Sequence, residues 1–133
     1  MRKLLLLLGF FILGLSASAE DDIRISIDKY SINSLTADDN WTDDPYAPLI
    51  GTIIIDADVS IVIETPEIEI YLYITEAQEP TITERNKIFW ECEVLNSSIE
   101  FGIASMLLDP NDGSAFLRVE FPDTRWNFSG FIE

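Results

Sequence analysis

Histidine is absent from this chain of 133 residues, and cysteine occurs once. A chain without histidine cannot form Ser-His-Asp or Cys-His catalytic groups or the common zinc sites. A single cysteine, Cys92, cannot form an intramolecular disulfide. The glycines stand apart, without the spacing of phosphate-binding loops. A carboxylate pair of the glycosidase kind remains as a catalytic option. A domain this small offers little cleft, however, so we expect a protein that is not an enzyme.

Basic residues are also scarce, with 8 Lys and Arg against 24 Asp and Glu. Two of the basic residues, Arg2 and Lys3, begin a segment that continues with an apolar run, residues 4–15, and ends on small residues at 17–19. This order is typical of a secretory signal peptide, so we expect residues 1–19 to be cleaved and the protein to be secreted or periplasmic. The apolar run is shorter than the roughly 20 residues of a membrane-spanning helix, which predicts no stable membrane span after cleavage.

Cleavage would leave residues 20–133, one domain by length, and would change the net charge from −16 to −18 because only Arg2 and Lys3 are lost from the charged residues. This charge argues against nucleic acid and anionic membranes as partners, because both require Lys and Arg for binding. A negative charge is compatible with calcium, a cationic protein or a neutral ligand as the binding partner. The same charge also serves solubility and protects sheet edges from pairing.

The clearest stretch of the chain, residues 51–75, predicts a β-hairpin. Apolar residues occupy the odd positions before Pro66 and the even positions after it, which is the period of strands with one buried face. Folding the chain at Pro66 places Ile63 opposite Ile68 and Ile61 opposite Ile70. The other face then carries carboxylates together with Tyr71 and Tyr73.

The remaining strands are expected at residues 22–32, 87–95, 99–108, 115–121 and 125–132. In the hairpin of residues 99–121 we expect Leu107 opposite Ala115 and Phe101 opposite Phe121, joined by a turn rich in Asp, Asn, Pro and Gly. The position of Cys92 on the apolar face of its strand predicts a buried, unreactive thiol. About seven strands without an amphipathic helix indicate a single antiparallel β-sandwich, with a barrel as the alternative.

A long polar segment, residues 33–48, follows the first strand and is the candidate site. Loops of this length in a small domain are usually functional or disordered. Its carboxylates offer the hard oxygen ligands that calcium prefers, and two strand-borne carboxylates could complete the site. The candidate metal ligands are Asp38, Asp39, Asp43, Asp44, Asp56 and Asp58.

The sequence of this loop resembles the first calcium loop of C2 domains over residues 35–46. Leu35, Asp38 and Asp39, followed by Asp44-Pro45-Tyr46, match the leucine, the aspartate and the later Asp-Pro-Tyr of that loop. The resemblance implies a β-sandwich that binds calcium through Asp38 or Asp39 and Asp44. Asp56-Ala57-Asp58 comes too early to match the later Asp-x-Asp loop of the family.

Three functions remain open from the sequence. One is a non-enzymatic module that binds a protein, for example a cationic one, or a glycan through aromatic side chains set among carboxylates: Trp41, Tyr46, Tyr71 and Tyr73. The alternatives are a calcium-dependent C2-like module and a structural or accessory subunit. Asn-x-Ser/Thr motifs begin at Asn40, Asn96 and Asn127. They would carry glycans only if the protein passes through a eukaryotic secretory route.

Overall fold

A computed structural model describes residues 22–56 and 59–133, and the predicted signal peptide lies outside this part of the chain. The described residues form β-strands and turns without a helix. The strands are β1 (Asp22–Ser34), β2 (Ala47–Asp56), β3 (Ser60–Glu64), β4 (Glu69–Ala77), β5 (Thr81–Ile82), β6 (Ile88–Leu95), β7 (Phe101–Leu108), β8 (Ser114–Glu120) and β9 (Thr124–Ile132). The prediction of an all-β protein is therefore confirmed.

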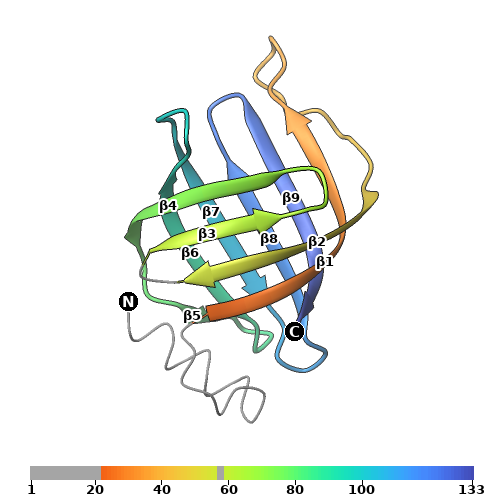
Figure 1. Cartoon of the computed structure of the whole chain (residues 1–133), viewed down its shortest axis with the longest axis vertical. Helices are drawn as coiled ribbons and strands as arrows, with labels where there is room; N and C mark the ends of the chain where they lie inside the picture. Colours follow the sequence, from red (N-terminus) through yellow and green to blue (C-terminus); the bar gives the residue numbers. More distant parts are fainter. Residues whose placement is uncertain (1–21, 57–58) are drawn as a thin grey trace.

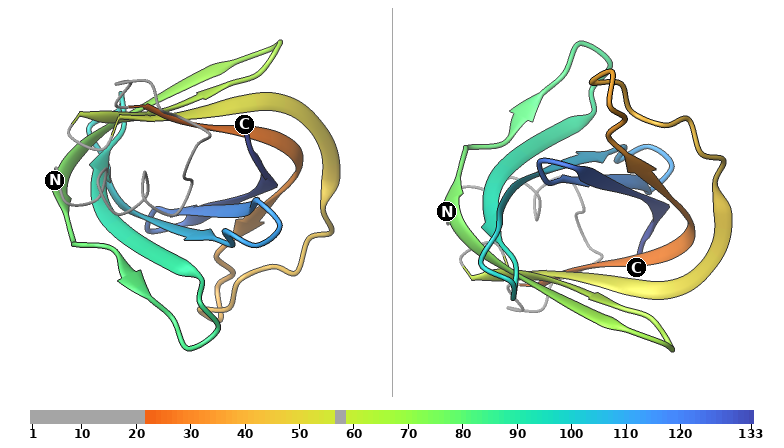
Figure 2. Two further views of the ribbon diagram at one scale, coloured as in Figure 1. Left: turned by 90° about the horizontal axis from the view of Figure 1, so that it is seen from below. Right: turned by 90° about the horizontal axis from the view of Figure 1, so that it is seen from above.

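The strands close into an eight-stranded antiparallel barrel, so the expectation of a sandwich is wrong. β1 to β4 form one meander and β6 to β9 form another, and the two are joined by β1 pairing with β9 and β4 pairing with β6. The short strand β5 adds to the edge of β6. Seen from either end, the strands enclose a continuous ring (Figure 2). Sandwiches and barrels share the alternation of buried and exposed residues, and the difference lies in which strands pair.

Two β-bulges bend β1 and β4, the strands of the first meander that pair with the second. The pairing of β1 shifts between Ile27 and Lys29, and that of β4 shifts between Ile74 and Glu76. A bulge adds one residue to a strand, bends it and increases its twist. The two meanders consequently cross at a steep angle, with β1 to β4 in front of β6 to β9 (Figure 1). Next to the first bulge, β9 carries Gly130 opposite Ile27, where a Cβ atom would collide with the backbone oxygen of Ser26.

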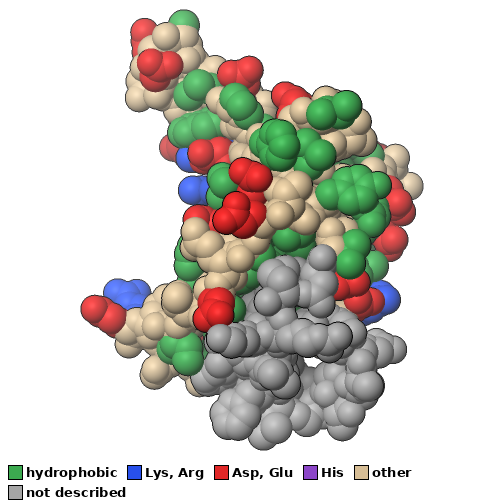
Figure 3. Space-filling view, turned by 90° about the vertical axis from the view of Figure 1, so that its left-hand side faces the viewer, with side chains coloured by type: hydrophobic (Ala, Val, Ile, Leu, Met, Phe, Trp, Pro, Cys, Tyr) green, Lys and Arg blue, Asp and Glu red, His purple; other side chains and the backbone are tan. Residues whose placement is uncertain are grey.

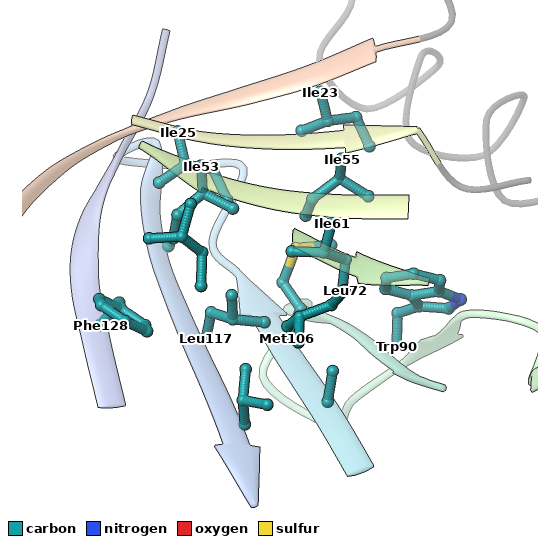
Figure 4. Close-up of a cluster of buried hydrophobic side chains, with 14 of the residues drawn as sticks. Ile23, Ile25, Ile53, Ile55, Ile61, Leu72, Trp90, Met106, Leu117 and Phe128 are labelled. Carbon is teal, nitrogen blue, oxygen red and sulfur yellow. The ribbon is translucent and has the colours of Figure 1, made fainter. Parts of the chain in front are cut away.

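Aliphatic and aromatic side chains fill the interior of the barrel. The inward residues of both meanders meet between the layers, including Ile25, Ile61, Met106 and Leu117 (Figure 4). An eight-stranded barrel has an interior just wide enough for side chains to fill. Trp90 is the largest fully buried residue, and its Nε1 has no hydrogen-bond partner among the described residues.

The predicted first hairpin has the correct faces but the wrong register. Ile63 pairs with Ile70 rather than Ile68, and Ile61 pairs with Leu72. The turn is wider because the side chain of Thr65 organises it: Thr65 Oγ1 accepts a bond from the Ile68 amide at 3.1 Å, and the Thr65 amide donates to the Ile68 carbonyl at 2.9 Å. A shift of two residues keeps the paired apolar side chains on the same face, whereas Val59 before β3 is exposed. The expected single strand before Pro66 is instead two strands, β2 and β3.

The second hairpin differs from the prediction by one residue, which exchanges the two faces of β7 and leaves those of β8 as expected. Leu108 pairs with Ala115, so Phe101 and Ile103 face outward. The strand is apolar on both faces, and alternation alone therefore does not choose between them. Close packing decides which face of β7 is buried, because a Cβ atom at Gly102 would lie 2.8 Å from the ring of the buried Phe121. Small residues are needed inside the barrel at this position.

Candidate binding surface

Two of the predicted aromatic residues, Tyr71 and Tyr73, form a pair on the outer face of β4. They point outward because Leu72 between them is buried in the core. Their rings meet edge to face, with centroids 4.7 Å apart and planes at 60°. The side chains remain 37% and 52% exposed. Two adjacent tyrosines in this arrangement offer contact area with little conformational freedom to lose.

Apolar side chains continue from this pair across the β4–β6 junction that closes the barrel. Tyr73 lies opposite Leu95 of β6, and Leu95 lies opposite Phe101 of β7. Directly opposite residues in an antiparallel sheet have Cβ atoms about 5 Å apart, so these side chains adjoin. Phe101 is 56% exposed. Tyr73, Leu95 and Phe101 form a row of neighbouring side chains because β4 pairs with β6 and because Phe101 lies on the outer face of β7.

Trp41 reaches the same surface from the loop between β1 and β2. A β-bridge to Leu35 fixes its backbone, and the guanidinium of Arg125 lies 4.8 Å from the centre of its ring. Trp41 lines a hollow of about 250 Å³ together with Phe101 and Ile103. We define the aromatic band as the outward residues that these contacts and strand pairings connect: Trp41, Tyr71, Tyr73, Leu95, Phe101 and Ile103.

Carboxylates flank the aromatic band. Glu93 and Glu120 pair with Ile103 from the strands on either side, and both line the hollow beside Trp41. Glu93 Oε1 accepts a hydrogen bond from Thr75 Oγ1 at 2.8 Å, which holds this carboxylate on the surface. Groups of apolar side chains and carboxylates lie close together on the side of the molecule shown in Figure 3. The band is therefore amphipathic, with negative charges around its apolar centre.

The fourth predicted aromatic residue, Tyr46, is placed elsewhere. It lies just before β2, where Lys29 Nζ is 5.4 Å from the centre of its ring. No strand pairing, ring contact or hollow among residues 22–56 and 59–133 connects it to the aromatic band. Leu95, Phe101 and Ile103 were not among the predicted site residues. The sequence does hold a signal for the outward position of Phe101 and Ile103. The even-numbered residues of β7 form a second apolar face that can fill the interior: Gly102, Ala104, Met106 and Leu108.

The carboxylates proposed as calcium ligands are spread along the molecule. Asp38 and Asp39 form the turn of a short hairpin, in which Asp39 has a φ of 59°. Asp44 Oδ2 accepts a hydrogen bond from the hydroxyl of Thr42 at 2.6 Å. Asp43 is exposed next to it. Asp56 ends β2, nine residues beyond the first residue of that strand, which is about 30 Å at the rise of a β-strand.

The structure therefore separates Asp56 from the loop carboxylates, and Asp58 lies outside the described residues. Among residues 22–56 and 59–133, no three acidic or cysteine side chains are grouped closely enough to hold a metal ion. Calcium binding by the loop of residues 33–48 stays a prediction.

Asn127, which begins one of the three glycosylation motifs, is buried in a polar network on the outer face of β9. Its Nδ2 donates to Asn33 Oδ1 at 2.8 Å and to Ser31 Oγ at 3.1 Å, while its Oδ1 accepts from Arg118 Nε at 2.7 Å. Arg125 Nε also donates to Asn33 Oδ1 at 2.9 Å. An amide with both of its ends engaged in this way leaves no place for a glycan.

Comparisons of the chain with protein-family models, with curated proteins and with solved structures found no match. In the part of the chain that the structure describes, no helix is long and apolar enough to cross a membrane.

Proposed function

We propose that this protein is a secreted or periplasmic binding module without catalytic activity, and that it engages a basic protein through the aromatic band. The observation that carries this proposal is the outward-facing row of Tyr73, Leu95 and Phe101 across the junction that closes the barrel, with Glu93 beside it. Monomeric proteins rarely expose such contiguous apolar surface without a use for it.

The chemistry of the band favours a basic protein as the partner. Exposed tyrosine and tryptophan side chains often dominate the energy of protein interfaces. The basic side chain of Arg125, which lies directly opposite Glu120, is placed over the ring of Trp41 and bonds to Asn33, and Glu93 faces outward beside the apolar residues. A partner that supplies Lys or Arg around an apolar centre would match both features, and the overall negative charge would speed its encounter.

Selection from a random peptide library displayed on phage tests this proposal without a known partner. We expect the selected peptides to combine Lys or Arg with large apolar residues. Their binding should weaken as salt is added, because exposed charges are screened. Neutral oligosaccharides that bind the band with no dependence on salt would instead favour a glycan partner.

A matched pair of variants locates the selected peptides. Phe101→Ser removes the centre of the aromatic band, and Phe131→Ser removes a phenylalanine of similar exposure, 51%, from β9. We expect the first change to weaken binding at least about tenfold, as loss of an interface anchor does. The second change should leave binding intact. Equal binding to both variants would show that the peptides bind elsewhere and would contradict the proposal.

A further inference from the structure

A second apolar hollow opens at one end of the barrel, where the β3–β4 turn faces the inner sides of β1 and β9. Its volume is about 280 Å³. A neighbouring hollow of about 450 Å³ shares four of its lining residues, Tyr30, Leu49, Thr65 and Glu67, so the two form one cleft. Five strands, β1 to β4 and β9, and the β3–β4 turn line the smaller hollow, mostly with aromatic and aliphatic side chains such as Tyr30, Ile70 and Trp126.

The cleft is part of the barrel interior rather than an accident of the outer surface. Ile63 and Phe128 at its floor belong to the buried core, and Tyr30 and Trp126 pack against that core. Tyr30 pairs with Phe128, so the aromatic residues of β1 and β9 stand side by side. The cleft is therefore an apolar extension of the barrel core that opens to solvent.

The rim of the cleft is held in place before any ligand arrives. Thr65 Oγ1 accepts from the Ile68 amide and donates to the Ile68 carbonyl, each at 3.1 Å, which fixes the turn above the cleft. Ile68 itself is 57% exposed although it lines the cleft. A preformed rim lowers the entropy that a ligand must overcome on binding.

Size and charge together define the class of ligand. A cavity of about 150 Å³ holds a benzene molecule, so a hollow of 280 Å³ has room for a larger apolar group. Among the described residues that line the two connected hollows, Glu67 is the one charged side chain. A ligand that complements this cleft has an apolar body and a positively charged head.

We propose that the cleft binds small amphipathic cations, such as alkyl or aryl amines, with the apolar part between Trp126 and Ile70 and the ammonium group beside Glu67. The mouths of β-barrels are frequent positions for sites of this kind. No residue of the aromatic band lines the cleft, so this site is independent of the proposed protein-binding surface.

Three molecules with the same eight-carbon tail and different head groups test the proposal: octylammonium, octanol and octanoate. Each is titrated into the protein at neutral pH, and binding is followed by calorimetry and by the NMR signal of the Trp126 indole. We expect octylammonium to bind most tightly and octanoate most weakly, and the Trp126 signal to shift. Equal affinity for the three head groups, or no binding of octylammonium, would overturn the proposal.

Variants at the rim separate a specific site from general adsorption. Ile68→Arg places a bulky cation at the entrance, and we expect it to reduce octylammonium affinity at least about tenfold by steric and charge repulsion. Ile82→Arg makes the same change at an exposed residue of β5 outside the cleft and should have no effect. Glu67→Gln should reduce the affinity for octylammonium about threefold, the effect of losing an exposed ion pair. The difference in affinity between octylammonium and octanoate should become smaller in this variant. Equal binding by Ile68→Arg and Ile82→Arg would contradict the site.

Discussion

Burial governs the chemistry of Cys92, whose side chain faces the barrel interior. Burial away from water and, to a smaller extent, the neighbouring negative charge of Glu91 together raise the pKa of the thiol from 9.0 to about 12. The prediction of a buried cysteine is confirmed. The thiol stays protonated in the folded protein at pH values where it ionises in the unfolded chain.

This difference in pKa gives Cys92 a defined effect on stability at high pH. Well below pH 9 both states hold the proton, so the thiol contributes no pH dependence there. As the pH rises from 9 towards about 12, the unfolded chain loses the proton while the folded protein keeps it, so the free energy of unfolding falls. We expect a loss of about 1.4 kcal/mol between pH 8 and pH 10 from this residue.

Denaturant titrations of the wild type and of Cys92→Ala at both pH values measure this contribution, because the other titrating groups are common to the two proteins. The stability of Cys92→Ala should fall less steeply with pH than that of the wild type. Parallel pH profiles would show that Cys92 is accessible to water in the folded state.

At the scale of the strands, carboxylates lie directly opposite one another across several strand pairs. Glu64 pairs with Glu69 in the β3–β4 hairpin, and Glu76 pairs with Glu93 at the β4–β6 junction that closes the barrel. Like charges in directly opposite positions destabilise a sheet. The junction is therefore weakened by charge at the place where the proposed binding surface crosses it.

We expect Glu76→Lys to raise the free energy of unfolding by about 0.5–1 kcal/mol, because it replaces a repulsive cross-strand pair with an attractive one. Glu84→Lys makes the same charge change in the exposed turn after β5 and serves as the control. Urea unfolding of both variants gives the comparison. If Glu84→Lys stabilises the protein as much, the gain reflects net charge and not the β4–β6 pairing.

Alternation in the sequence predicted most strands and left the register of the hairpins open. The side chains of β6, and those of β1 before its bulge, alternate cleanly enough to place these strands within a few residues. The register of the β3–β4 hairpin depends on hydrogen bonds of the Thr65 side chain, which spacing alone does not reveal. The outward position of Phe101 and Ile103 does not follow from alternation, because both faces of β7 are apolar.

At the scale of the whole molecule, the barrel depends on contacts that the local sequence does not encode. The pairings of β1 with β9 and of β4 with β6 join residues far apart in the chain. The bulges that permit them leave little trace in the pattern of apolar residues. Tyr71 and Tyr73 could be placed on a surface from the sequence. Their continuation through Leu95 to Phe101 could not, because it requires the closed barrel.

The net charge of −16 should make salt act in opposite directions on folding and on binding. Screening of the repulsion among carboxylates should raise the melting temperature between about 0.05 and 0.5 M sodium chloride, over which the Debye length falls well below 10 Å. A gain of about 1 kcal/mol corresponds to roughly 4 °C for a domain of this size. The affinity for the selected basic peptides should fall over the same range. A melting temperature that falls with salt would contradict the role of charge repulsion.

The most direct test of the proposed function is to map the contact of a selected basic peptide on the folded protein by NMR chemical shifts. We expect the shifted amides to cluster on the outer residues of β4, β6 and β7 around Tyr73, Leu95 and Phe101, with smaller changes at Trp41. Shifts confined to the acidic loop, residues 33–48, or to the cleft beside Glu67 would contradict the aromatic band as the binding surface.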